Sequence, residues 1–101
     1  LIIEGKNGLE KVKPDDIYFI EGDESGSILH LLDEEISSGK QIDEIGKLFP
    51  LNGFMKVSET FIVNVNKIFL VKFPEIIIAD KMSVISVDEN KKEQLEAMLR
   101  K

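Results

Sequence analysis

Short apolar runs separated by turn residues dominate the first forty positions of the chain. Segments rich in β-branched and aromatic residues favour strands at 1–3, 9–12, 17–20 and 27–32. The run Ile17–Ile20 has no polar alternation, which predicts a strand buried on both faces. Gly22–Ser27 is predicted to form a polar hairpin loop, and Asp33–Ser38 to form either a further strand or an exposed connection.

The hydrophobic period then changes from that of a strand to that of a helix. Apolar residues recur at spacings of three and four, at Ile42, Ile45, Leu48 and Phe49. This stripe predicts a short helix near residues 41–49, which Pro50 would end. A turn is expected next, at Asn52–Gly53.

Strand-like segments return in the second half and lead into a last helix. The expected strands cover 54–57, 68–73, 75–78 and 82–87, with a break at Pro74 and a turn at Ala79–Lys81. Asp88 is expected to cap a helix near 88–100, with Glu89 in its first turn and Arg100 and Lys101 in its last. The whole pattern predicts a mainly β fold with two helices.

Composition narrows the class of protein without identifying a function. A chain of 101 residues that is 43% hydrophobic and 32% charged fits one folded domain over residues 1–101. Its start at Leu1 suggests a domain cut from a longer protein. The absence of cysteine fits a reducing cytoplasm, and the apolar runs are far shorter than the roughly 20 residues of a membrane span. We therefore expect a cytoplasmic domain.

Charge is distributed unevenly between the two halves of the chain. The net charge is −6, with −7 in residues 1–50 and +1 in residues 51–101. An acidic total argues against nonspecific nucleic-acid binding, which depends on a basic surface. A local basic patch in the second half is compatible with these values.

Residue types that support catalysis or metal binding are scarce. The single histidine, His30, lies between leucines in an expected strand, where packing explains it better than a Ser-His-Asp triad. The acidic stretch that begins at Glu21 partly follows the spacing of an EF-hand calcium loop, but Leu32 stands where that loop needs glutamate. An acidic hairpin is the simpler interpretation. We expect no enzyme activity, no cofactor, no metal and no small-molecule substrate.

The most informative stretch is FMKVSETFIVNVNKI, residues 54–68, in which β-branched and aromatic residues surround a short polar insert. This stretch resembles the central signature of the LytTR family, DNA-binding domains found mostly at the C-terminus of bacterial response regulators. The positions that agree with the signature are Phe54, Lys56, Val57, Phe61, Ile62, Val63 and Asn64. Thr60 replaces the family's serine. The apolar members of this set are expected to be core or strand residues, and Asn64 a turn former.

The resemblance extends through nearly the whole chain. Residues 16–21, DIYFIE, look like the family's Asp-Ile-apolar-Tyr-apolar-Glu strand. Residues 42–50 look like its short helix ending in Leu-Pro, and residues 76–87 look like its terminal hairpin. The resemblance implies an elongated, mainly β fold of packed sheets, in which loops rather than a recognition helix insert into DNA grooves.

The resemblance also implies which residues contact DNA. Contacts would come from the loop after the first of these strands, from the polar insert, and from the turn entering the last helix. Carried over to this chain, the residues are Ser25 to Ser27, Lys56, Ser58, Glu59, Thr60, Asp88, Glu89 and Asn90. Further phosphate-contact candidates are Lys67, Lys91 and Lys92. We expect these three lysines and Lys56 to converge on one face.

At several of these positions the chain departs from the family pattern. Ser58 replaces the usual histidine, Glu59 stands where a basic or amide residue is common, and Asp88-Glu89 replaces Ser-Arg. A carboxylate can accept a hydrogen bond from cytosine N4, but phosphate repels it. These departures put the strength of DNA binding in question.

Two functions remain open at this stage. In the first, the domain is the output module of a bacterial transcriptional regulator of the two-component type. It would bind duplex DNA at direct-repeat promoter sites, as two copies, with a receiver or sensor domain upstream. In the second, the same fold has lost DNA binding and acts as a protein-interaction or dimerisation module, in which Glu59, Asp88 and Glu89 form a negative patch. The first is the preferred prediction.

Overall fold

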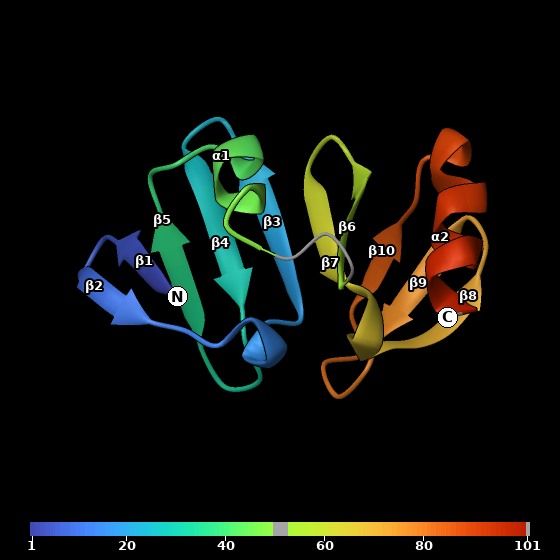
Figure 1. Ribbon diagram of the computed structural model, residues 1–101, viewed down its shortest axis with the longest axis horizontal. Helices are drawn as coiled ribbons and strands as arrows, with labels where there is room; N and C mark the ends of the chain where they lie inside the picture. Colours follow the sequence, from blue (N-terminus) through green and yellow to red (C-terminus); the bar gives the residue numbers. More distant parts are fainter. Residues whose placement is uncertain (50–52, 101) are drawn as a thin grey trace.

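The computed structural model describes residues 1–49 and 53–100, whose strands form three antiparallel sheets (Figure 1). The first sheet pairs β1 (Ile2–Gly5) with β2 (Gly8–Lys11). The central sheet has the order β5-β4-β3-β7-β6 and consists of β3 (Phe19–Asp23), β4 (Gly26–His30), β5 (Glu35–Ser38), β6 (Phe54–Ser58) and β7 (Phe61–Asn64). The third sheet has the order β10-β9-β8 and consists of β8 (Ile68–Lys72), β9 (Glu75–Ile78) and β10 (Val84–Ser86).

Helical segments are short and connect or cover the sheets. The α-helices are α1 (Ile42–Gly46) and α2 (Lys92–Leu99). Single 3₁₀ turns occur at η1 (Pro14–Asp16), η2 (Val65–Lys67) and η3 (Glu89–Lys91). The domain measures 37 × 25 × 22 Å along its principal axes. The mainly β, elongated fold predicted from the sequence is therefore confirmed. Among the described residues, none of the helices has the length and apolar character needed to cross a membrane.

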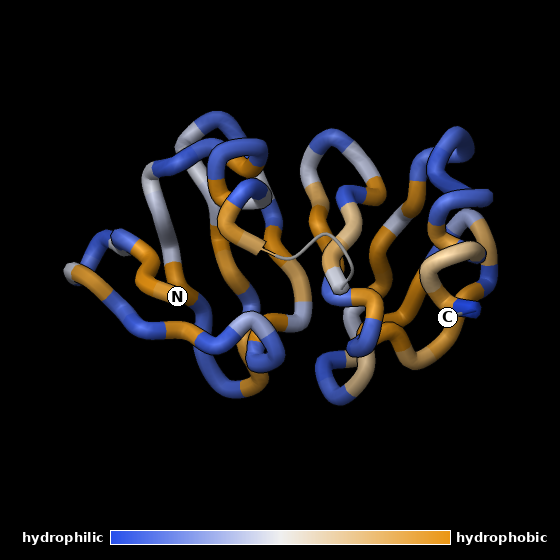
Figure 2. The backbone as a smooth tube through the Cα atoms, in the orientation of Figure 1, coloured by the Kyte–Doolittle hydropathy of each residue, from blue (hydrophilic) through white to orange (hydrophobic). Residues whose placement is uncertain are grey.

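The central sheet is buried on both faces. This explains the apolar run Ile17–Ile20, which leads into its middle strand, β3. Ile17 and Ile20 belong to a core that the first sheet and α1 cover. Tyr18 and Phe19 belong to a second core, which the third sheet and α2 cover. Figure 1 shows these covering elements on opposite sides of the central strands, and Figure 2 shows apolar residues gathered along the strands with hydrophilic residues at the turns. The prediction that this run is buried on both faces is right.

The hairpin turn between β3 and β4 is tighter than the sequence predicts. Gly22 pairs with Ser27 and Asp23 with Gly26, which leaves only residues 24 and 25 outside the ladder. Gly26 makes this possible because it adopts a φ of +139°, and a Cβ there would collide with the carbonyl oxygen of Ser38. The predicted loop over Gly22–Ser27 is therefore mostly strand.

Helix α1 is shorter than the hydrophobic stripe predicts. Beyond Gly46 the backbone bonds become i to i+3, with Leu48 donating to Ile45 and Phe49 to Gly46. This tighter winding turns side chains away from the α-helical stripe, so Leu48 is exposed while Phe49 remains buried. The predicted helix end at Pro50 and the turn residue Asn52 lie outside the described residues.

The last helix begins later than predicted. Residues 89–91 form the 3₁₀ turn η3, and α2 starts at Lys92. Asp88 precedes η3, but its side chain makes no capping hydrogen bond, so the predicted cap is wrong. Instead, the backbone N–H of Asp88 donates to Val57 O at 2.8 Å, which ties this turn to the central sheet. Arg100 follows the end of α2, and Lys101 lies outside the described residues.

Candidate nucleic-acid interface

Three turns that are distant in sequence lie along one edge of the molecule. We call this edge the loop edge and define it by residues 23–26, 58–61 and 88–91, which lie along the top of Figure 1. The backbone N–H of Gly22 donates to Thr60 O at 2.8 Å, and that of Asp88 donates to Val57 O at the same distance. The structure thus brings together the three segments that the sequence predicts to contact DNA.

The first turn of the loop edge is stabilised by its own side chains. The hydroxyl and the backbone N–H of Ser25 donate to Asp23 Oδ1 at 2.7 and 2.8 Å. These hydrogen bonds hold the pKa of the Asp23 carboxyl below its usual value. Ser25 is exposed, whereas Ser27 is buried and its hydroxyl donates to Lys40 O at 2.7 Å. Because its side chain is engaged in the fold, Ser27 is removed from the candidate DNA contacts.

The second turn presents two exposed side chains next to a half-buried lysine. Glu59 and Thr60 are exposed at its tip, and Ser58 Oγ accepts a hydrogen bond from the backbone N–H of Thr60 at 3.4 Å. A bulge between Lys56 and Ser58 precedes the turn. Lys56 Nζ lies 2.7 Å from Asp43 Oδ1 of α1, so this lysine already has an acidic partner.

The third turn carries both charge signs. Asp88, Glu89 and Asn90 are exposed, and Lys91 is half-buried. The exposed Lys92 begins α2, and its Nζ lies 5.1 Å from the ring centroid of Phe73. Lys91 ends η3 and Lys92 begins α2, so both lysines directly follow the exposed residues 88–90.

Lys67 lies elsewhere, so the prediction that four lysines converge on one face is wrong. Strand β7 starts at the loop edge and runs away from it, and Lys67 follows its end in η2. There Lys67 Nζ lies 4.8 Å from the ring centroid of Tyr18, and Lys67 O accepts a hydrogen bond from Ala79 at 2.7 Å.

We call the end of the molecule that holds Lys67 the far edge and define it by residues 31–34, 64–67 and 79–83. Side chains connect its segments. Tyr18 OH donates to Asp80 Oδ2 at 2.7 Å, and Lys81 Nζ donates to Leu31 O at 2.5 Å. The hydrogen bond to Asp80, together with burial, raises the pKa of the Tyr18 phenol.

Asn64 is the buried polar residue of the far edge. Its Nδ2 donates to Ile17 O at 2.9 Å, and its Oδ1 accepts from the backbone N–H of Asn66 at 3.1 Å. The side chain is 2% exposed and caps η2. Asn64 is therefore a turn-forming residue, as the sequence predicts.

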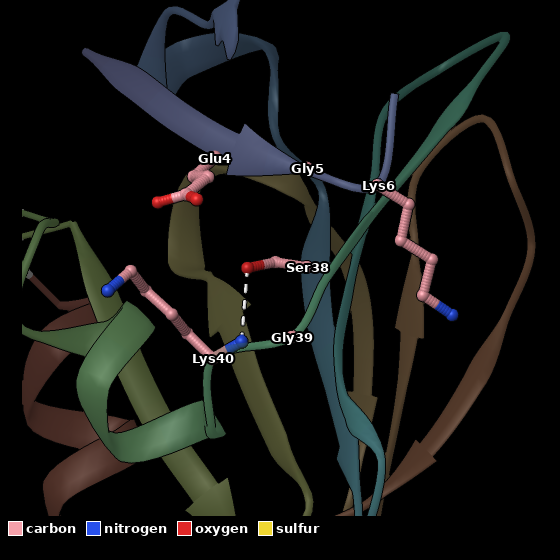
Figure 3. A pocket seen from close by; sticks show the side chains of 6 residues that line it. All are labelled: Glu4, Gly5, Lys6, Ser38, Gly39 and Lys40. Carbon is pink, nitrogen blue, oxygen red and sulfur yellow. Dashed lines mark hydrogen bonds between the residues drawn. The ribbon is translucent and has the colours of Figure 1, made fainter. Parts of the chain in front are cut away.

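Two lysines next to the loop edge were not among the phosphate-contact candidates predicted from the sequence. Lys6, in the β1–β2 turn, and Lys40, between β5 and α1, line a hollow of about 290 Å³ together with Glu4. Figure 3 shows their side chains pointing away from each other, so they do not converge on one anion. Their neighbourhood depends on the packing of β1 against β5, which no local pattern in the sequence indicates.

His30 is a packed residue of the central sheet. The His30 ring stacks on Phe19 with centroids 4.2 Å apart. The Nε2 atom of His30 lies 3.0 Å from Glu21 Oε1, and its Nδ1 atom lies 3.1 Å from Glu35 Oε2. These contacts join β3, β4 and β5, as expected for a packed histidine in a strand.

Comparisons with known proteins agree with this architecture. The family described as the LytTr DNA-binding domain matches residues 7–100 of the chain. A similar solved structure is the LytTr DNA-binding domain assigned to a methyl-accepting/DNA response regulator from Bacillus cereus. It superposes with a TM-score of 0.78 at 16% sequence identity, over 98% of this chain and 94% of that chain. No curated protein sequence matches this chain. At such low identity the structural match speaks for the fold alone.

Proposed function

Because the chain belongs to the LytTr DNA-binding domain family, we propose that it binds a specific duplex DNA sequence through the loop edge. Two backbone hydrogen bonds give this proposal its main support. The N–H of Gly22 donates to Thr60 O and the N–H of Asp88 donates to Val57 O, and these bonds hold three exposed turns in one row. Base and phosphate contacts need side chains held in a constant relative position. A row of turns held by the backbone meets this requirement while leaving side chains exposed.

The proposed contacts are exposed or half-buried residues on or next to that edge. They are Ser25, Lys56, Ser58, Glu59, Thr60, Asn90, Lys91 and Lys92. The lysines would contact phosphates, which supply most of the affinity of such complexes. The carboxylate of Glu59 suits the major groove, where cytosine N4 and adenine N6 are the hydrogen-bond donors.

Family membership supports a broader proposal about the biological role. The domain would be the output module of a bacterial response regulator, acting in the cytoplasm under an upstream receiver or sensor domain. Two copies would occupy direct repeats in a promoter, so regulation would act by bringing protomers together. This part of the proposal rests on analogy with the family.

The test is selection of the domain against a random duplex library, followed by a salt titration on the enriched duplex. We expect an enriched motif whose log affinity falls by several units per unit of log salt concentration. Failure of the folded domain to enrich any duplex would contradict the proposed function.

A matched pair of lysine variants tests the position of the interface. Lys56→Ala should weaken binding to the enriched duplex and reduce the salt slope by about 1. Lys67→Ala removes the same charge at the far edge and should leave both quantities unchanged. Equal losses in the two variants would show that the loop edge is not the DNA-binding surface.

A further inference from the structure

Lys56, the lysine closest to the tip of the β6–β7 turn, is held by an acidic residue of the same chain. Its Nζ lies 2.7 Å from Asp43 Oδ1, and the two side chains are 35% and 73% exposed. The hydrogen bond and charge of Lys56 hold the pKa of the Asp43 carboxyl below its usual value, with a smaller contribution from Lys47. Asp43 is therefore ionised at neutral pH and places a carboxylate oxygen within hydrogen-bond distance of the Lys56 ammonium.

Apolar packing, and not the ion pair, holds Asp43 in this position. Its neighbours Ile42 and Ile45 are buried in the core beneath α1. Glycines allow α1 to lie directly on the central sheet, because a Cβ at Gly22 would come within 2.8 Å of Ile42 Cβ and a Cβ at Gly46 within 2.8 Å of Ile62 Cδ1. The packing of α1 therefore fixes the backbone of Asp43 next to Lys56, independently of the ion pair.

We propose that Asp43 regulates DNA binding at the loop edge as an intramolecular competitor of phosphate for Lys56. This inference rests on the proposed function. A duplex that approaches the loop edge must exchange the Asp43 carboxylate for a phosphate oxygen, and the displaced carboxylate then repels the backbone. Asp43 thus lowers affinity for every sequence, so that only a site with good base contacts is retained.

Lys47 adds to this effect. It directly follows the end of α1, four residues after Asp43. Together with Asp43 and Lys56 it lines a hollow of about 250 Å³, whose apolar lining is Phe49, Phe54 and Ile62. Asp43 is the acidic residue among the described residues that line this hollow, so removal of its charge leaves Lys47 and Lys56 there without a carboxylate. The phosphate backbone would then meet a locally basic surface.

The test compares Asp43→Asn with Glu44→Gln, a control that removes the same charge from the next residue. Glu44 is exposed and forms no ion pair within residues 1–49 and 53–100. Each variant is titrated with the duplex enriched from the random library, and melting curves confirm that it is folded. We expect Asp43→Asn to tighten binding about two- to fivefold more than Glu44→Gln does, the range expected for an exposed ion pair.

The Lys56→Gln background separates competition from general repulsion. It removes the ammonium but keeps most of the side-chain stem. In this background the excess of Asp43→Asn over Glu44→Gln should shrink to the smaller part that Lys47 accounts for. Equal effects of Asp43→Asn and Glu44→Gln in the wild-type background, or an excess that is undiminished in the Lys56→Gln background, would overturn the inference and leave the proposed function standing. Failure of both the wild type and Asp43→Asn to enrich any duplex would overturn the proposed function and the inference together.

Discussion

The two edges of the molecule are built in different ways. At the far edge, side chains reach between segments: Tyr18 bonds Asp80, Lys81 bonds Leu31 O and Asn64 bonds Ile17 O. At the loop edge, backbone groups link the three turns, and the side chains at their tips are exposed. The difference indicates a division of labour, in which side-chain chemistry fastens the sheets together at one end and is available to a partner at the other.

Two phenylalanines at opposite ends of the β6–β7 hairpin provide the largest test of this comparison. Phe54 starts β6 toward the far edge and is 8% exposed, whereas Phe61 starts β7 at the loop edge and is only partly buried. Phe54→Ala should lower the free energy of unfolding by about 3–5 kcal/mol. Phe61→Ala should cost less, because part of its ring already contacts water. Urea unfolding of both variants measures the two losses of free energy. Equal losses would contradict the expected difference between the two ends of the hairpin.

A smaller loss is expected at the buried amide of the far edge. Asn64→Ala leaves the Ile17 carbonyl and the Asn66 N–H without their partner, which should cost about 1–3 kcal/mol of unfolding free energy. Asn66→Ala serves as control, since Asn66 is exposed and uses only its backbone N–H in this contact. The control should stay within about 0.5 kcal/mol of the wild type. A loss in Asn66→Ala as large as that in Asn64→Ala would contradict this role of Asn64.

The phenol of Tyr18 gives a pH-dependent test of the same edge. Its pKa is raised above the ordinary value of 10.0 because it donates to Asp80 and is buried. The hydrogen bond between Tyr18 and Asp80 therefore contributes fully to the free energy of unfolding below pH 10.0. This contribution is lost as the pH rises through the raised pKa of Tyr18. Tyr18 is the only tyrosine of the chain, so ultraviolet absorbance follows its ionisation directly. Asp80→Asn should move the transition back toward lower pH; a transition that does not move would rule out Asp80 as its cause.

Sequence patterns predicted strands and turns well where these depend only on residues that are close in sequence. The polar insert between Phe54 and Ile68 became a turn between β6 and β7, because β-branched and aromatic residues on both sides favour paired strands. The run Ile17–Ile20 was expected to be a strand with both faces covered. Its burial was predicted correctly, but β3 starts only at Phe19. The family resemblance, rather than any local pattern, identified the three turns as one candidate interface.

What the sequence could not predict depends on distant contacts. Ser27 resembles an exposed loop serine, but the tight turn at Gly26 places its hydroxyl against Lys40 O, 13 residues away. Lys67 and Lys56 belong to the same signature stretch, yet the direction of β7 places them at opposite edges. The pairing of Lys56 with Asp43 requires α1 to lie directly on the sheet. Gly22 and Gly46 allow this close approach, which is a tertiary contact that no local pattern in the sequence indicates.

We propose that DNA contacts the loop edge and not the far edge. The most direct measurement is the map of backbone amide NMR shifts on adding the duplex enriched from the random library. We expect the largest shift changes in residues 23–26, 58–61 and 88–91, with residues 64–67 and 79–83 unaffected. Changes centred on the far edge, or spread evenly over the chain, would contradict it.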